Sequence, residues 1–199
     1  MIRQAGLAFL GAALALLGAG PAAAEGSWRD FAGVSNTAYV EPNGDRAIQL
    51  SIDVPAPPQA VFDAFATAEG FKSWAVPFAQ IDLRVGGMIE SSYNPAAKPG
   101  DRDNIKNQIL AYLPGRLLVI RNVQAPTDFP DPELFAKTVT IIALAPLDDG
   151  ATRVTITHAG YGPGEGFDRL YKMFEWGDAY SLTGLRQRFV SGPKDWSKP

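Results

Sequence analysis

The sequence contains no cysteine and a single histidine, His158. Without thiols the chain can form no disulfide bond, zinc–thiolate site or cysteine nucleophile. One histidine cannot make a histidine-rich metal site, and no cluster of carboxylates has the ligand spacing that would assist it. We therefore expect neither a metal nor a cofactor.

Several signatures of enzymes and of nucleic-acid binding are also missing. There is no serine nucleophile elbow, phosphate loop, dinucleotide fingerprint or zinc signature. The stretch Gly160–Gly166 is rich in glycine, but Pro163 removes a backbone donor that a phosphate cradle requires, so we interpret the stretch as a hinge. The 18 basic and 21 acidic residues include no Lys/Arg cluster, so we expect no nucleic-acid partner.

The first 24 residues have the three parts of a secretory signal peptide. Arg3 is the positive part, Ala5–Leu17 is an uncharged apolar run, and Ala22–Ala24 offers small residues before a cut at Glu25. The run is shorter than the roughly 20 residues of a membrane span, and an uncleaved anchor is the alternative. We therefore expect a periplasmic or secreted protein that is not inserted in a membrane after cleavage.

The chain left after cleavage is the size of one domain. Removing 24 of the 199 residues leaves 175, and the net charge changes from −3 to −4 because Arg3 is lost. We expect a lead-in at 25–35, a single domain at 36–192 and a tail at 193–199. The oligomeric state stays open.

The first half of the domain reads as a hairpin followed by two short helices. A strand is predicted at Asn36–Glu41, and Ile48–Val54 alternates apolar and polar residues with the period of a strand. Pro58 suits the first turn of a helix, which we expect to continue to about Thr67. Gly70 is expected to interrupt the chain before a second short helix.

The second half reads as a meander of strands and a long last helix. Strands are predicted at Gln80–Arg84, Met88–Tyr93, Ile105–Leu113, Leu117–Val123, Thr138–Ala145 and Thr152–Ala159. An irregular loop is expected at Gln124–Leu134, and apolar residues at helical spacing from Phe167 to Phe189 predict a helix of about 25 residues. The fold class is therefore α+β, with a curved antiparallel sheet wrapped around the last helix.

Three stretches carry a family resemblance, namely Ile52–Trp74, Asp82–Met88, and Ile109–Leu117 taken with Thr152–Gly160. They resemble the strand, proline step, helix and Gly-Gly turn of the SRPBCC (START-like) helix-grip superfamily. Within it, the chain is most similar to homologues of the activator of heat-shock-protein-90 ATPase, as an exported variant. The resemblance implies a cavity between sheet and last helix. It departs where Phe174–Asp178 replaces a Gly-Trp pair of the family.

His158 and Asp178 are the candidate catalytic residues. His158 shares strand parity with Val154 and Ile156, so it should point to the concave face, either as a cavity base or as a hydrogen-bonded core histidine. Asp178 lies within the apolar stripe of the last helix. It either faces the cavity and meets His158, or an irregularity at Gly177 turns it to solvent.

The candidate ligand-binding residues are Trp74, Phe78, Tyr93, Asn107, Arg121, His158, Tyr161, Phe174 and Asp178. The aromatic residues at 74, 78 and 93 lie near the expected pocket rim, with plain core positions as the alternative. Asn107 and Arg121 share parity with apolar neighbours on central strands, and Arg121 and Asn122 cannot both face the pocket.

A second group of residues lies on the other side of the last helix. Met173, Trp176 and Tyr180 are expected under the loop 124–135, with a partner surface or a pocket lid as alternatives.

Three functions remain open at this point. The first is an exported binder of a small hydrophobic molecule, and the second is a cyclase- or hydratase-type enzyme with His158 and Asp178 as an acid–base pair. The third, activation of a chaperone ATPase, follows only from the family resemblance and ranks last because an exported protein would not meet a cytoplasmic chaperone.

Overall fold

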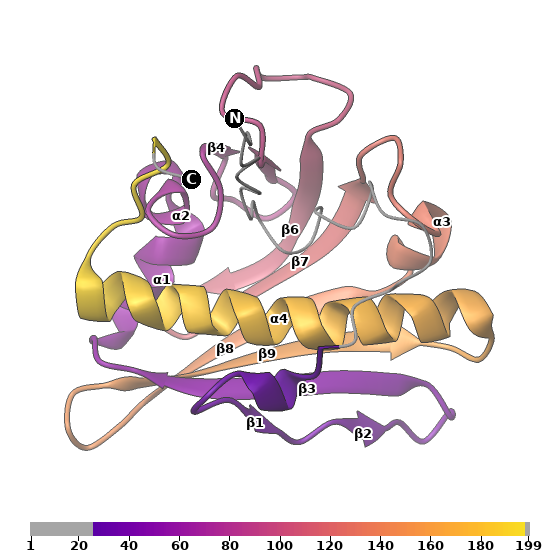
Figure 1. Ribbon diagram of the computed structural model, residues 1–199, viewed down its shortest axis with the longest axis horizontal. Coiled ribbons are helices and arrows are strands. Elements are labelled where there is room, and N and C mark those ends of the chain that lie inside the picture. Colours follow the sequence, from indigo (N-terminus) through magenta and orange to yellow (C-terminus); the bar gives the residue numbers. More distant parts are fainter. Residues whose placement is uncertain (1–25, 198–199) are drawn as a thin grey trace, which may run out of the picture.

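The computed structural model describes residues 26–197, so the expected signal peptide lies outside the described residues (Figure 1). The helices are η1 (Trp28–Asp30), α1 (Pro58–Ala66), α2 (Ala68–Lys72), α3 (Pro132–Phe135) and α4 (Glu165–Ser191). The strands are β1 (Ser35–Asn36), β2 (Tyr39–Val40), β3 (Arg46–Val54), β4 (Phe78–Ile81), β5 (Met88–Ser92), β6 (Ile105–Leu113), β7 (Leu117–Gln124), β8 (Val139–Pro146) and β9 (Thr152–Tyr161).

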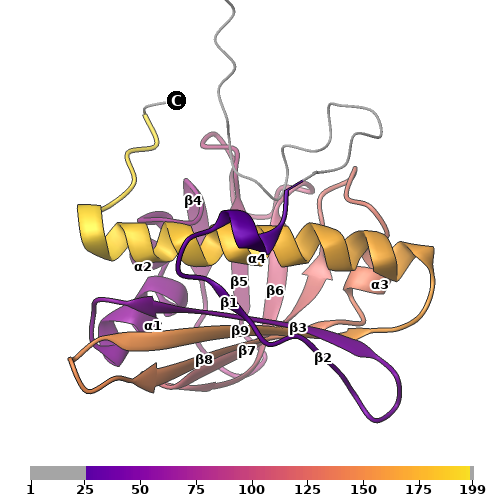
Figure 2. The ribbon, with the colours of Figure 1, turned by 60° about the horizontal axis from the view of Figure 1, so that its bottom comes forward.

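All nine strands form one antiparallel sheet. The order is β1-β3-β9-β8-β7-β6-β5-β4, and β2 also pairs with β3. Figure 1 shows α4 lying across one face of this sheet, and Figure 2 shows it as a separate layer above the strands. The predicted α+β helix-grip fold is confirmed. Within residues 26–197, no helix is both long and apolar enough to cross a membrane.

Alternation along β3 fixes its pairing with β9. The partners Leu50↔Ile156 and Ile52↔Val154 put apolar side chains on the helix side, whereas Asp53 faces solvent beside Arg153. A slip of one residue would turn every apolar side chain of β3 away from the core, so the pattern specifies the register.

The break between the two short helices differs from the prediction. Thr67 has an extended backbone and ends α1, and its side chain accepts a hydrogen bond from the Gly70 amide to begin α2. Gly70 therefore lies inside α2 and does not interrupt it. A side chain at position 70 would collide with the carbonyl oxygen of Asp63, so the close approach of the two helices requires glycine there.

Other segments match the predictions with shifted bounds. The strand expected at Asn36–Glu41 is divided into β1 and β2, and β4 begins two residues before the expected Gln80. The irregular loop after β7 contains the single turn α3. Residues 193–197, part of the expected tail, return to α2, where the Lys194 amide donates to the Ser73 carbonyl.

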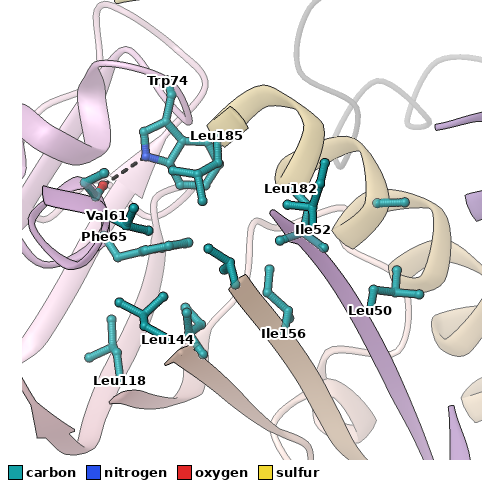
Figure 3. Packing of buried hydrophobic residues seen from close by; sticks show 14 of the residues in the cluster. Leu50, Ile52, Val61, Phe65, Trp74, Leu118, Leu144, Ile156, Leu182 and Leu185 are labelled. Carbon is teal, nitrogen blue, oxygen red and sulfur yellow. Dashed lines mark hydrogen bonds between the residues drawn. The ribbon is translucent and has the colours of Figure 1, made fainter. Parts of the chain in front are cut away.

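The core lies between α4, the sheet and α1. Leu170, Leu182 and Leu185 of α4 are fully buried. Figure 3 shows Leu182 close to Ile52, and Leu185 next to Trp74. The Trp74 indole donates a 2.9 Å hydrogen bond to the Ala64 carbonyl of α1. Side chains from α4 thus hold the short helices against one end of the sheet.

Substitution of Leu182 by alanine should lower the free energy of unfolding by about 2–5 kcal/mol, because it leaves a cavity in a fully buried layer. Val190→Ala on the exposed face of the same helix is the matched control and should change it by less than about 0.5 kcal/mol. Denaturant unfolding measures both. Equal losses for the two variants would contradict the assigned inner face of α4.

Candidate functional site

A cavity of about 220 Å³ lies between the concave face of the sheet and α4. Its walls are mostly apolar and come from β5 to β9, the α1–α2 region, the loop before α3, and one face of α4. Among the wall residues are Phe65, Ile89, Leu118, Phe129, Ile142 and Ile156. The position between sheet and helix is the one predicted.

Two glycines of α4 are part of the roof of this cavity. Gly177 and Gly184 lie seven residues apart, two helical turns, on the face toward the sheet. A methyl group at 177 would meet no atom within 4 Å, and one at 184 would only touch Trp74 at 3.9 Å. Each glycine costs the helix about 1 kcal/mol relative to alanine. Steric crowding does not require glycine at either position, and both positions leave the cavity open.

His158 and Asp178 converge inside the cavity wall. His158 Nδ1 lies 3.4 Å from Asp178 Oδ2, and its Nε2 lies 2.8 Å from Thr140 Oγ1. A carboxylate can only accept, so the ring donates from Nδ1 to Asp178, and a neutral ring accepts a hydrogen bond from the Thr140 hydroxyl at Nε2. All three residues line the cavity. The irregularity proposed at Gly177 does not occur, because α4 continues unbroken through this position.

Aromatic rings surround the histidine and restrict its movement. Phe174 lies 4.5 Å from the His158 ring, Phe135 lies 6.0 Å away and Tyr161 lies 5.7 Å away, all edge-on. The His158 side chain is only 4% exposed and that of Asp178 is 13% exposed. Both alternatives for His158 thus hold in part, since it is a hydrogen-bonded core residue that also reaches the cavity.

Tyr161 does not line the cavity, in contrast to the prediction. Gly160 has a φ of +94°, and the β3–β9 register shifts between Arg46 and Ile48, so a β-bulge turns Tyr161 inward behind His158. Its ring is fully buried against Tyr171 and Phe167. The Tyr161 hydroxyl has no hydrogen-bond partner within residues 26–197. Burial, and then the nearby Asp178 carboxylate, raise the pKa of this phenol well above its usual value.

Asn107 faces the cavity as predicted, but Arg121 does not. Arg121 shares parity with Leu117 and Val119, and that face of β7 is the outer one, so its guanidinium is exposed to solvent. Asn122 is the residue that points inward. It is buried, and its amide donates to Asn107 Oδ1 at 3.2 Å. The prediction that Arg121 and Asn122 face opposite sides of the strand was correct, but the choice of Arg121 as the inward residue was wrong.

Some of the aromatic residues predicted to bind the ligand line the cavity, and one does not. Trp74, Tyr93 and Phe174 line the cavity, whereas Phe78 is half-buried in the edge strand β4 and does not. Burial, with a smaller effect of Tyr180, raises the pKa of Tyr93 to about 12. The Tyr93 phenol is therefore a neutral hydrogen-bonding group at physiological pH.

The outer aromatic residues of α4 are covered differently from the expectation. Trp176 stacks on Tyr180 with ring centres 5.5 Å apart, and Phe31, next to η1, contacts both rings. Figure 2 shows η1 against α4. The lead-in segment covers these rings, not the loop 124–135. Met173 and Tyr180 also line the cavity.

Thr140 and Lys194 are cavity residues that sequence reasoning did not select. Thr140 pairs directly with His158 across the β8–β9 hairpin, so aligning the two predicted strands, Thr138–Ala145 and Thr152–Ala159, would have found it. Lys194 follows the last helix and reaches the cavity only because the chain returns to α2, which no local pattern indicates.

Within the described part of the chain, no group of three or more His, Asp or Glu residues is placed to hold a metal ion.

The sheet, the helix and the enclosed cavity define a helix-grip protein of the SRPBCC, or START-like, class. Residues 55–189 match the family model described as Activator of Hsp90 ATPase homolog 1-like protein, which covers more than half of the chain. The protein therefore belongs to this family. No curated protein matches the chain.

Solved structures share the fold at low sequence identity. The Aha1 dimer structure from Colwellia psychrerythraea has a TM-score of 0.56 and 19% identity, covering 73% of this chain and 97% of that one. CalU16 from Micromonospora echinospora has a TM-score of 0.51 and 21% identity, covering 81% and 85%. A protein of unknown function from Enterococcus faecalis has values of 0.56 and 15%, covering 83% and 82%.

Removing the Tyr161 hydroxyl should stabilise the protein. Tyr161→Phe relieves a buried hydroxyl that has no protein partner, so we expect the free energy of unfolding to rise by about 1 kcal/mol. Thermal or urea unfolding measures the change. Tyr171→Phe, at a half-buried position, is the control and should be near neutral. A loss of about 1 kcal/mol at position 161 would instead mean that the hydroxyl donates a hydrogen bond in solution.

Proposed function

We propose that this protein is an exported binding protein for a small hydrophobic molecule, which it holds in the cavity between the sheet and α4. The observation that carries the proposal is a mostly apolar cavity roofed by α4, with two glycines of this long helix, Gly177 and Gly184, among its lining residues. Ligand sites have this composition, a mostly apolar wall with a few convergent polar groups.

The size of the cavity limits the ligand. Its volume of about 220 Å³ lies below the roughly 300–1,000 Å³ that is usual for drug-sized ligands. A small single-ring or short-chain molecule suits this space better than a sterol or a large polyketide. Asn107 and Thr140 on the sheet and Asp178 on α4 offer polar contacts to such a molecule.

The cost of the two glycines supports a binding role. A buried helix position normally gains from a larger side chain through burial of apolar surface and a better helix propensity. At Gly177 neither gain is blocked by a neighbouring atom. A helix that only had to close the core would be more stable with alanine or leucine there.

Export is the second part of the proposal and rests on residues 1–24 alone. A fusion of the full chain to alkaline phosphatase, which is active only outside the bacterial cytoplasm, tests it. We expect phosphatase activity with the full chain and none when residues 1–24 are deleted. Cytoplasmic fusion protein in both cases would contradict export and would return chaperone activation to consideration.

Two variants of Gly177 separate binding from stability. Gly177→Leu should fill the cavity and abolish ligand binding, whereas Gly177→Ala should keep it and raise the free energy of unfolding by about 0.5–1 kcal/mol. Binding is measured by native mass spectrometry and by thermal shift against a panel of small apolar molecules. Equal binding by the leucine variant would place the ligand elsewhere, and the lack of any ligand for the unaltered protein would overturn the proposal.

An enzyme of the cyclase or hydratase type is the second candidate, because His158 and Asp178 lie within reach of each other in the cavity wall. The contact of Thr140 with His158 Nε2 makes the candidate weaker, since both ring nitrogens already have protein partners. A base acting at Nε2 would first have to displace this hydroxyl.

Turnover distinguishes an enzyme from a binder. If the site is catalytic, the bound molecule should change mass during incubation with the unaltered protein but stay unchanged with His158→Gln or Asp178→Asn, as followed by mass spectrometry. If the bound molecule is recovered unchanged from all three proteins, the protein is a binder and the catalytic role is contradicted.

Activation of a chaperone ATPase ranks third. It is suggested by the description of the family that the chain matches. An exported protein would not meet a cytoplasmic ATP-driven chaperone, so this role depends on the export test failing.

A further inference from the structure

A groove of about 410 Å³ adjoins the cavity at the C-terminal end of α4. The cavity and the groove share four lining residues, Trp74, Tyr180, Gly184 and Lys194. The returning chain after α4 forms one side of the groove, and Figure 1 shows this segment next to α2. The groove is therefore the mouth through which the cavity meets solvent at this end.

The charge of the mouth groove is positive, although the whole chain is acidic. Arg188 and Lys194 line it, and no acidic residue does within residues 26–197. Neither cation takes part in an ion pair in the described chain. The net charge of the full sequence is −3, so two uncompensated cations in one groove form a local exception.

The Arg188 side chain is fixed by one hydrogen bond and keeps further hydrogen-bond donors free. Its Nε donates to Ser73 Oγ at 2.9 Å, and its two terminal NH₂ groups have no protein acceptor in the described chain. A guanidinium fork with both terminal groups free is suited to bidentate contact with a carboxylate or phosphate.

Lys194 is also positioned by its backbone. Its amide donates to the Ser73 carbonyl at 2.8 Å, and Trp196 behind it donates its indole N–H to the Lys72 carbonyl at 2.6 Å. The Lys194 ammonium lies 4.1 Å from the centre of the Trp196 ring. Burial lowers the pKa of Lys194, and a bound anion would offset that effect.

The middle of the cavity carries the opposite charge. Asp178 is the one acidic residue among the lining residues of the described chain, and it lies about 9 Å from Gly184 along the helix axis. A negative group would be repelled at Asp178 and attracted at the mouth. The negative group inside the cavity and the positive groups at the mouth therefore define a single orientation for an amphipathic anion.

We infer that the ligand is an amphipathic anion, in its simplest form a medium-chain carboxylate, with its apolar body in the cavity and its carboxylate between Arg188 and Lys194. This inference rests on the proposed binding function and names its ligand class. Lys194 lies beyond the family match, which ends at residue 189, so this half of the anion site is contributed by the chain's own C-terminal segment.

Three ligands of equal chain length test the charge requirement, namely decanoate, decanol and decyltrimethylammonium. Isothermal titration at pH 7 should give the tightest binding for decanoate, by about fivefold or more over decanol, and the weakest for the cation. Added sodium chloride should weaken decanoate binding and leave decanol binding unchanged, because salt screens only the charged contact.

Variants at the mouth locate the contact. Lys194→Gln and Arg188→Gln should each weaken decanoate binding by about fivefold to tenfold while decanol binding stays within about twofold. Lys98→Gln, in an exposed loop, and Arg121→Gln, on the outer face of the sheet, are the matched controls and should change neither affinity. Far-ultraviolet circular dichroism confirms that each variant is folded.

The possible failures are distinguishable. If decanol and decanoate bind equally and both mouth variants bind like the unaltered protein, the anion site is wrong and the binding function stands. If a mouth variant weakens all three ligands equally, the side chain shapes the groove and does not recognise charge, which also overturns the inference. If none of the three ligands binds, the inference fails, and the panel of small apolar molecules in the Gly177 experiment decides separately whether the binding function stands.

Discussion

The contact between α4 and the concave sheet is the constraint on which the other features depend. Leu170, Leu182 and Leu185 are fully buried against the strands and hold the helix at a fixed height above them. Between these anchors, Gly177 contributes no side chain to the same face. A helix is stiff, and this one is anchored on both sides of Gly177. Its middle therefore cannot bend toward the sheet to fill the space, and a cavity remains there.

The polar groups of the cavity follow from the same geometry. An antiparallel hairpin places Thr140 opposite His158, and the height of α4 brings Asp178 to within hydrogen-bonding distance of the same imidazole. These three groups satisfy one another in an apolar wall, where an unpaired polar group would be costly. The arrangement thus explains how a charged residue is retained within the apolar stripe of the helix, and it leaves Asp178 as an acidic group within the cavity wall.

Much of the fold was predictable because its elements obey strong local rules. The period of two along β3 and the helical spacing between Phe167 and Phe189 require little information from elsewhere in the chain. Site residues that depended on parity alone, such as His158 and Asn107, were also placed correctly. Arg121 was misplaced because parity by itself does not say which face of a strand is inner. Tyr161 does point inward, through the bulge at Gly160, but its ring is buried behind His158 and does not reach the cavity.

The sequence by itself determined the α+β class, the apolar and polar faces of β3, the family and the inward direction of His158, since each depends on patterns of residues close together in the chain. Only the tertiary structure decided that Asp178 meets His158, that the lead-in covers Trp176, and that Lys194 returns to the mouth of the cavity. The physical reason is that these contacts join segments brought together by packing of α4, and no local periodicity encodes the height, rotation or end point of a packed helix.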